Sequence, residues 1–189
     1  YGYLGFSAIQ LVGEVNPAAL AGNSWDEILL EYCQGRRRHP IWAVGELGFQ
    51  DKEKIDSVQT IFLLKELSRS AVLDALKNGK MYAKLEYKEN SLNLEEFSIR
   101  DQNYKNSGFM GDEVLCSSTP FINIRGNFLE PDKIKIDLIQ DGKVIQKFEI
   151  DKSPFKIEFQ DNLLGSKKKT YYRLYIESNS GSKIITNPI

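Results

Sequence analysis

The first part of the chain alternates short apolar runs with amphipathic helical patterns. Ser24 stands where one helix should begin and Gly35 where it should end, and Ser68 and Gly79 bound a second helix in the same way. Apolar runs without polar alternation are typical of strands buried on both faces, as in parallel βα units. We therefore expect an incomplete α/β domain over residues 1–87. The runs that predict its strands are 6–12, 40–47, 59–64 and 81–85.

From about residue 109 the pattern changes to strict alternation. Ile134, Ile136 and Leu138 fall on one face of a predicted strand, and Asp141-Gly142 is a strong hairpin signal directly after it. Six or seven short strands in about 80 residues predict a small antiparallel sandwich. The sequence therefore predicts an α/β domain followed by an all-β domain. Their predicted extents are 1–87 and 109–189, joined by a polar connecting segment, 88–108, of which part should pair as a strand.

The composition narrows the class of protein. Hydrophobic residues make up 41% of the 189 residues and charged residues 27%, as in ordinary globular proteins. The formal net charge is -1, so no nucleic acid or anionic membrane is expected as a partner. No apolar run approaches the roughly 20 residues that span a bilayer. Cys33 and Cys116 lack metal-ligand spacing, and we expect two free, buried thiols.

Three stretches resemble one known arrangement of domains. The segments "HPIWAVGELGFQD" and "LSRSAVLDALKNGKMYAKL" are similar to the C-terminal part of the polymerase and histidinol phosphatase (PHP) family, with Leu76, Gly79, Tyr82 and Ala83 matching a recurrent motif. The closing "TYYRLYIESNSGSKIITNPI" resembles the last strands of an immunoglobulin-like domain appended to many bacterial PHP proteins. The resemblance implies a partial PHP-like β/α barrel followed by an immunoglobulin-like β-sandwich, as if the chain began in the middle of the barrel domain.

The resemblance also implies a metal site. PHP proteins hold divalent metals such as Mn, Fe or Zn with His and Asp side chains, and the metals activate water for phosphoester hydrolysis. Laid on this chain, the last ligand motif places Gly48 at the Asp position and Gln50 at the His position, so both positions are degenerate. Glu46 is the remaining group at this motif that could bind a metal, from a shifted position. We therefore expect no metal and no cofactor on this chain alone.

Other candidate residues have a functional and a structural interpretation. Glu14 and Asn16 follow the first strand and could line a pocket, or they form an ordinary loop and turn. His39 lacks an orienting partner nearby and is expected at the surface. Arginines 36–38 could bind phosphate or complement a helix C-terminus. The aromatic residues of the second half could form a sugar platform, although a sandwich core explains them more simply.

Three functions remain open from the sequence. In the first, the chain is the C-terminal fragment of a PHP-like metal-dependent phosphoesterase homologue that is catalytically degenerate and has a scaffold or binding role. In the second, it belongs to an active phosphoesterase whose main ligands, and its divalent metal, lie upstream. In the third, the β-sandwich is a carbohydrate- or protein-binding module. The resemblance is also compatible with export to the periplasm or cell surface.

The incomplete barrel carries a further expectation about partners. Open strand edges are avoided by soluble chains. Residues 1–87 should therefore pair with the missing N-terminal part of the barrel, with a second copy, with a separate chain, or with the sandwich.

Overall fold

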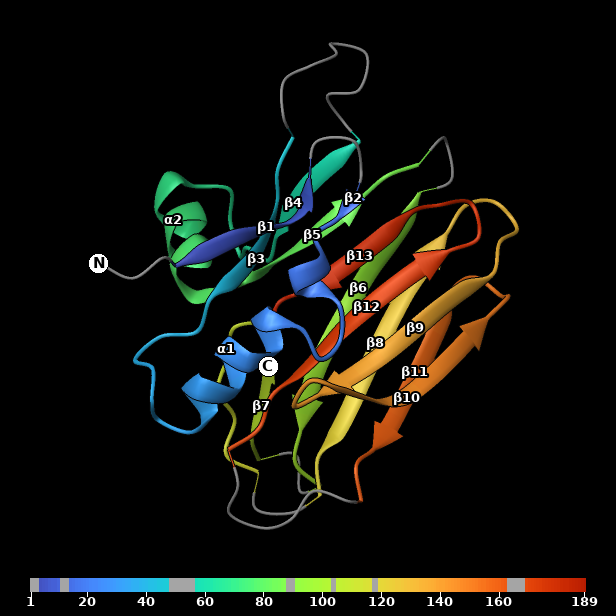
Figure 1. Cartoon of the computed structure of the whole chain (residues 1–189). Helices are drawn as coiled ribbons and strands as arrows, with labels where there is room; N and C mark the ends of the chain where they lie inside the picture. Colours follow the sequence, from blue (N-terminus) through green and yellow to red (C-terminus); the bar gives the residue numbers. More distant parts are fainter. Residues whose placement is uncertain are drawn as a thin grey trace.

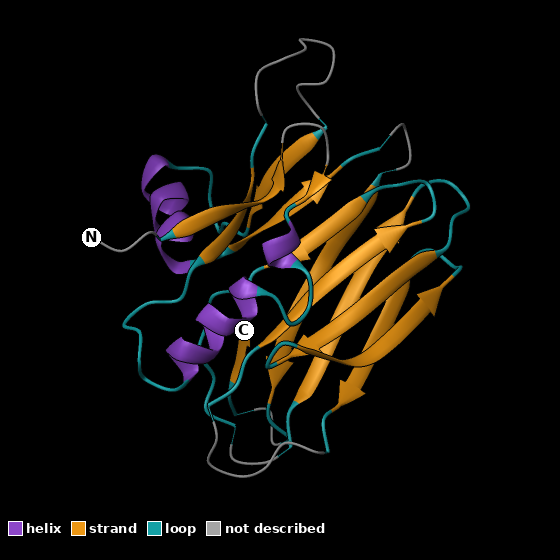
Figure 2. Cartoon of the chain, in the orientation of Figure 1, coloured by secondary structure: helices purple, strands orange, loops and turns teal. Residues whose placement is uncertain are grey.

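The computed structural model describes residues 4–10, 14–47, 57–87, 91–102, 105–116, 119–162 and 169–189. Strands dominate these residues, and the helices are few (Figure 2). The helices are the 3-10 helix η1 (Pro17–Ala19), α1 (Ser24–Cys33) and α2 (Arg69–Asn78). The strands of the first part are β1 (Gly5–Gln10), β2 (Glu14–Val15), β3 (Trp42–Gly45), β4 (Val58–Phe62) and β5 (Met81–Leu85). Those that follow are β6 (Leu92–Arg100), β7 (Ser107–Phe109), β8 (Phe121–Phe128), β9 (Ile134–Gln140), β10 (Lys143–Ile150), β11 (Phe155–Gln160), β12 (Tyr172–Ser178) and β13 (Lys183–Thr186).

The strands form three sheets that stack in layers (Figure 1). Sheet A has the order β2-β1-β3, sheet B the order β10-β9-β12-β13-β5-β4, and sheet C the order β11-β8-β6-β7. One apolar core lies between sheets B and C. A second core lies on the opposite side of sheet B, where sheet A and α1 cover the β5 and β13 region. Sheet B is therefore the middle layer.

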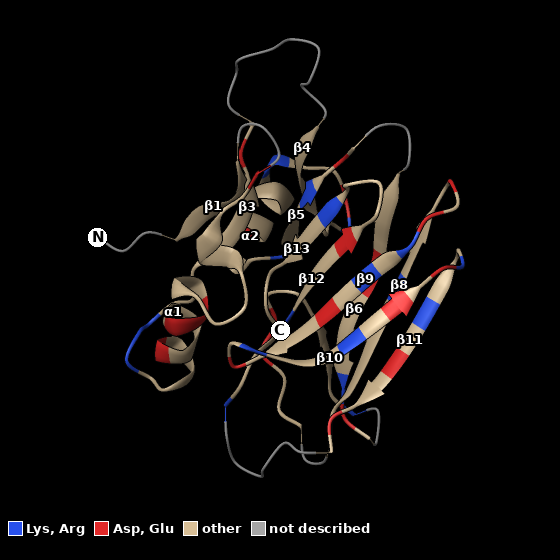
Figure 3. Cartoon of the chain, turned by 45° about the vertical axis from the view of Figure 1, so that its right-hand side comes forward, with Lys and Arg blue, Asp and Glu red and all other residues tan. Residues whose placement is uncertain are grey.

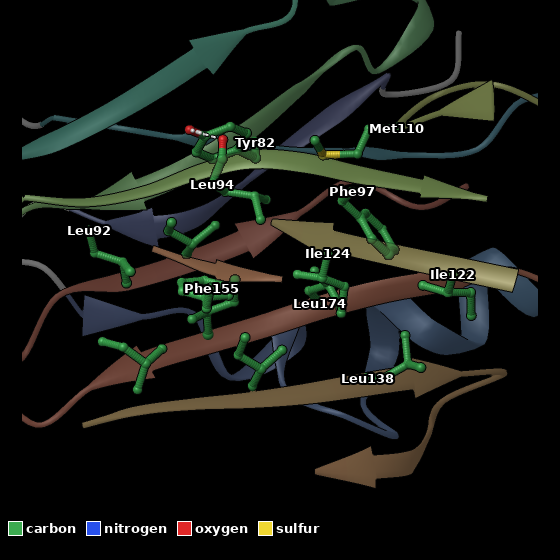
Figure 4. Packing of buried hydrophobic residues seen from close by; sticks show 14 of the residues in the cluster. Tyr82, Leu92, Leu94, Phe97, Met110, Ile122, Ile124, Leu138, Phe155 and Leu174 are labelled. Carbon is green, nitrogen blue, oxygen red and sulfur yellow. Dashed lines mark hydrogen bonds between the residues drawn. The ribbon is translucent and has the colours of Figure 1, made fainter. Parts of the chain in front are cut away.

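The main core contains side chains from both halves of the sequence. Phe97 of β6 and Ile124 of β8 are fully buried in sheet C, and they face Leu138 and Leu174 of sheet B (Figure 4). Side chains at alternate positions of these strands enter the core, except where the register of β6 shifts between Leu94 and Glu96. The alternation read from the sequence at Ile134, Ile136 and Leu138 is confirmed, because these three side chains are fully buried.

The predicted partial β/α barrel is wrong. The described chain is an all-β structure with two short α-helices, and its strands pair in antiparallel fashion apart from β1 and β3. β5 explains the error: it lies between β4 and β13, antiparallel to both, and all five of its residues are buried. Burial on both faces arises here because sheet B is covered on two sides, and not because helices flank a parallel sheet.

Sheets B and C both cross the predicted domain boundary. β5 precedes the connecting segment, yet it pairs with β13 near the C-terminus, from Lys183↔Leu85 to Thr186↔Tyr82. β6, which the sequence placed in the connecting segment as a possible strand, is confirmed as a strand and lies inside sheet C. Strand β5 of the first part thus pairs with the sandwich, which was one of the alternatives expected for the open strand edges of residues 1–87.

The local signals for helices and turns hold better than the long-range ones. Ser68 caps α2 by accepting a hydrogen bond from the Ala71 amide, and Gly79 ends this helix in the left-handed conformation. Gly35 is also left-handed after α1. The predicted cap at Ser24 is displaced by one residue, since the N-cap position is Asn23. Asp141 and Gly142 have φ values of 50° and 79° and form the predicted hairpin turn between β9 and β10.

Asn187 joins sheet A to sheet B through its side chain. Its Oδ1 accepts a hydrogen bond from the Ala43 amide at 2.7 Å, and its Nδ2 donates to the carbonyls of Ala43 and Met81 at 3.1 and 3.0 Å. The side chain is fully buried. An amide side chain here replaces the backbone pairing that β3 and β5 lack.

Replacing Asn187 with alanine should lower the free energy of unfolding by about 2–4 kcal/mol, because buried backbone groups of Ala43 and Met81 lose their partner. Chemical denaturation of the full chain measures this loss. Asn179→Ala, at an exposed turn position, is the matched control and should change stability by no more than about 0.5 kcal/mol. An equal effect of both substitutions would contradict the role assigned to Asn187.

Tyr82 makes the stability of the fold sensitive to alkaline pH. Burial raises the pKa of its phenol from 10.0 to about 12, although its hydroxyl donates to the Leu94 carbonyl at 3.4 Å. Below pH 10 the phenol is neutral in both states. Above it, the unfolded chain ionises first, so stability is lost as pH rises from about 10 to 12. The loss expected from Tyr82 is about 2–3 kcal/mol.

The measurement is the denaturation midpoint as a function of pH for the native chain and for Tyr82→Phe, with Tyr87→Phe at an exposed position as control. Tyr82→Phe should lessen the alkaline loss, and the control should not. An unchanged pH profile in Tyr82→Phe would show that Tyr82 ionises as easily in the folded chain as in the unfolded one.

Candidate ligand-binding face

Glu14 and Glu46 lie at the same edge of sheet A. Ile9 near the end of β1 pairs with Val15 on one side and Gly45 on the other, so each glutamate adjoins a residue paired with Ile9. The backbone amide of Glu46 also donates to the Ile9 carbonyl at 2.9 Å. Both carboxylate side chains are exposed. The parallel pairing of β1 with β3 therefore brings together two of the residues singled out from the sequence.

Asn16 has a structural role in the turn after β2. Its Oδ1 accepts from the Ala18 amide at 3.0 Å and caps η1, and its Nδ2 donates to the Ser7 carbonyl at 2.9 Å. Its backbone amide donates to the Ala8 carbonyl. Both ends of the side-chain amide are thus engaged by the fold, which favours the turn interpretation over a pocket-lining one.

The described residues do not fit the metal centre that the PHP resemblance implies. No cluster of three or more His, Cys, Asp or Glu side chains suited to a metal occurs in that part of the chain. Within the described ranges no third ligand accompanies the two carboxylates at the edge of sheet A, and divalent metals bind larger sets. Gly48 and Gln50, the degenerate motif positions, lie outside the described residues. The phosphoesterase hypotheses therefore stay predictions.

The remaining sequence candidates are surface groups or core residues. His39 is exposed, as expected. Arg37 lies 3.9 Å from Glu31 on the preceding helix, and Lys169 lies 2.8 Å from Glu113. Tyr171 and Tyr172 are almost fully buried, which confirms the core interpretation of these two aromatic residues of the second half. Trp25 and Trp42 of the first part are buried as well. None of the helices in the described part of the chain is long and apolar enough to cross a membrane.

Neither Cys33 nor Cys116 is in a disulfide bond, as predicted, but both side chains are only half-buried. Burial raises the pKa of the Cys116 thiol, and the nearby Asp101 carboxylate raises it further. Both effects disfavour the thiolate, which is the reactive form of cysteine. Cys116 is therefore a poor candidate for a nucleophile.

A buried polar cluster fastens α1 to sheet B. Asp26 accepts two hydrogen bonds from Arg173, Nε to Oδ1 and Nη2 to Oδ2, both at 2.7 Å, and a third from Tyr171 Oη at 2.8 Å. The Arg173 guanidinium also lies 4.6 Å from the centre of the Trp25 ring. Burial, with the adjacent Asp26 carboxylate, raises the pKa of Tyr171 far above its usual value. The cluster is inaccessible to a ligand, and its role is structural.

The outer face of sheet C carries the most developed polar surface of the described chain. Cross-strand partners in antiparallel pairs share a face, so the register defines rows of side chains opposite the core. We call these residues the sheet C face. Its rows are Glu158, Asn123, Ser98 and Phe109; Gln160, Phe121, Arg100 and Ser107; Lys156, Arg125 and Glu96; and Asn127 with Asn93, beside which Glu95 lies at a bulge.

Side chains of the sheet C face hold one another in place. Arg125 Nε lies 2.6 Å from Glu96 Oε2, and Ser98 Oγ donates to the other oxygen of Glu96 at 2.6 Å. On the adjoining rows, Arg100 Nη2 donates to Glu158 Oε2 at 2.7 Å. The Arg100 guanidinium lies 4.4 Å from the centre of the Phe121 ring. The result is two sets of cross-strand polar contacts, one between β6 and β8 and one that spans β8 from β6 to β11.

This face is open and holds an exposed aromatic ring. Phe109, at the edge strand β7, is 50% exposed, and Arg125, Lys156 and Glu158 are exposed as well, whereas Ser98 in the middle of the face is buried. A shallow pocket of about 360 Å³ adjoins the same edge, between residues 105–107 and 113–115. An exposed ring beside fixed polar groups on the outer face of a sheet is an arrangement suited to binding and not to a core.

The outer face of sheet B differs in composition. One row across β10, β9, β12 and β13 alternates in charge through Glu149, Lys135, Glu177 and Lys183, with Lys183 3.4 Å from Glu177. On the next row Lys147 pairs with Asp137 at 3.1 Å. Charged residues of both signs follow one another along β9 and β10 in Figure 3. Charges of this kind keep an exposed sheet soluble and unpaired. We therefore regard the sheet C face as the stronger candidate.

Sequence patterns alone did not identify the sheet C face. Alternation places Asn123 and Ser98 on the polar faces of their strands, but it does not show that they are neighbours of each other or of Phe109, because that depends on strand register. Comparisons of the chain with protein-family models, with curated proteins and with solved structures found no match. The resemblance to PHP proteins and the immunoglobulin-like classification stay predictions, and the sheet C face is interpreted from its own residues.

Proposed function

We propose that this chain is a binding module whose ligand lies on the sheet C face. The observation that carries the proposal is the set of cross-strand polar contacts beside the exposed Phe109 ring on the outer face of sheet C. The third function left open by the sequence, a carbohydrate- or protein-binding sandwich, is the one that this geometry supports best.

The hydrogen bonds within the face favour binding for a physical reason. Ordering a long polar side chain on association costs about 0.5–1.5 kcal/mol. Arg125, Glu96, Arg100 and Glu158 are already held by their neighbours, so a ligand meets them in a preset geometry. Sheets B and C share one core, which supports the face from behind and keeps it rigid. The face therefore has the fixed geometry of a recognition surface.

The experiment compares binding of the full native chain with that of two double variants. Asn123→Ala with Arg125→Ala alters the sheet C face. Lys135→Ala with Asp137→Ala alters the outer face of sheet B and is the control. A glycan array and a displayed peptide library are the probes. Ligands should bind the native chain and the control and lose affinity at least about tenfold for the sheet C variant.

Thermal unfolding of each variant shows whether its fold is intact. Ligands that bind both variants as well as the native chain would contradict the proposal, because the binding surface would then lie elsewhere. A native chain that retains nothing from either probe would contradict it as well.

A further inference from the structure

We infer that the ligand of the sheet C face is a neutral glycan chain, with Phe109 as the ring on which a sugar stacks. This inference rests on the proposed function, and it names the ligand class for the same face.

The charges of the sheet C face point to an uncharged ligand. Three basic side chains, Arg100, Arg125 and Lys156, are matched by the three carboxylates of Glu95, Glu96 and Glu158. Two of these pairs are in direct contact across the strands, at 2.7 and 2.6 Å. A surface whose charges cancel locally does not steer a charged partner toward it. Acidic glycans and highly charged proteins are therefore disfavoured.

The polar side chains of the sheet C face offer the hydrogen-bond donors and acceptors that sugar hydroxyl groups need. A carboxylate offers two acceptor oxygens, a guanidinium presents parallel N–H donors, and an amide offers one of each kind. Glu96 and Arg125 stand beside Ser98 and Asn123 on neighbouring strands. Pairs of adjacent hydroxyls on a sugar ring can both donate and accept, so they match such a surface without any net charge.

The apolar content of the face fits a sugar better than a protein. Phe109 has half of its surface exposed, whereas Phe121 is only partly exposed and lies against the Arg100 guanidinium. Protein interfaces place several apolar and aromatic anchors in a desolvated centre. A sugar needs one exposed ring for its C–H face, together with polar groups around it. Phe109 lies at the end of a row that continues through Ser98 and Asn123.

The dimensions of the face suit an extended chain of sugars. Four strands at a spacing of about 4.8 Å give a surface about 14 Å wide from β11 to β7. The row that contains Phe109 crosses all four strands at right angles to their direction, and ends at Glu158. A chain of several sugar rings lying along this row would contact each of its side chains in turn.

Isothermal titration of the full chain tests the inference. The probes are neutral oligosaccharides of glucose, mannose, xylose and N-acetylglucosamine, with polygalacturonate as the acidic comparison. Phe109→Ala and Phe109→Leu should each weaken binding of the neutral ligand at least about tenfold, whereas Phe109→Tyr, which keeps the ring, should retain it. Leu67→Ala, at a leucine that is 93% exposed and lies before α2, is the matched apolar control and should bind like the native chain.

The salt dependence gives a second readout. A tenfold rise in ionic strength should change the affinity for the neutral ligand by less than about twofold, because no ion pair forms with it. Binding of polygalacturonate in preference to every neutral probe would overturn the inference, as would the absence of any glycan binding. Peptide ligands that depend on Asn123 and Arg125, found without glycan binding, would leave the proposed function standing and reject the glycan. Glycan binding unaffected by Phe109→Ala, Phe109→Leu and Asn123→Ala would reject both.

Discussion

Replacing Asp26 with alanine is expected to lower the free energy of unfolding by about 3–5 kcal/mol, because it leaves the Arg173 guanidinium buried without its counter-ion. Arg173 is fully buried and Asp26 is 1% exposed. Asp26 accepts both hydrogen bonds that hold this guanidinium, and Arg173 Nη1 has no other partner to replace them. The same substitution also removes the acceptors for Tyr171 Oη and the Gly22 amide.

The matched control for Asp26→Ala is Glu27→Ala on the next residue of α1, which is exposed and should change stability by about 0.5 kcal/mol or less. The double variant Asp26→Leu with Arg173→Met removes both charges and should recover much of the stability lost in Asp26→Ala. Urea denaturation of the four chains measures the differences. A double variant no more stable than Asp26→Ala would show that the loss comes from packing around α1 and not from an unpaired charge.

The cluster around Asp26 also shows why sequence reasoning has a limited reach. The helix that carries Asp26 was predicted from its apolar spacing, and the strand that carries Arg173 from its alternation. Their contact joins positions 147 residues apart, and no local pattern encodes it. Hydrogen bonds within one turn or hairpin, such as those at Ser68 and Asp141-Gly142, depend on neighbouring residues alone, which is why they were predicted correctly.

The predicted fold class is wrong because one sequence pattern can arise from two different structures. An apolar run such as Met81–Leu85 shows that a strand is buried on both faces, but a parallel sheet under helices and the middle sheet of three layers both produce that pattern. The choice depends on what pairs with the strand, and the partners of β5 are β4 and β13, of which the second lies about 100 residues away. The sheet C face could not be predicted for the same reason. Its rows contain residues of four strands, and which residues are neighbours depends on the register of those strands.

Residues 109–189 in isolation should fail to fold cooperatively, against the domain division predicted from the sequence. The fragment lacks β6, which lies between β8 and β7 in sheet C, and β5, which pairs with β13 in sheet B. Five buried core side chains are lost with them: Tyr82, Leu92, Leu94, Phe97 and Ile99. At about 1.5–3 kcal/mol for each, their loss is comparable with the whole free energy of unfolding of a typical domain, about 5–15 kcal/mol.

A longer fragment, residues 57–189 with Arg173→Met, is the appropriate comparison for this experiment. It keeps every strand of sheets B and C, and the substitution removes the charge that Asp26 would otherwise pair. We expect it to unfold in a cooperative thermal transition followed by circular dichroism, whereas 109–189 should show a gradual loss of signal and poor dispersion of its amide proton resonances. A sharp transition in 109–189 would mean that its strands β8 to β13 are sufficient for a core. In that case β6 would not be needed for the sandwich to fold. The fragment would nevertheless lack Ser98 and Arg100, which are part of the sheet C face.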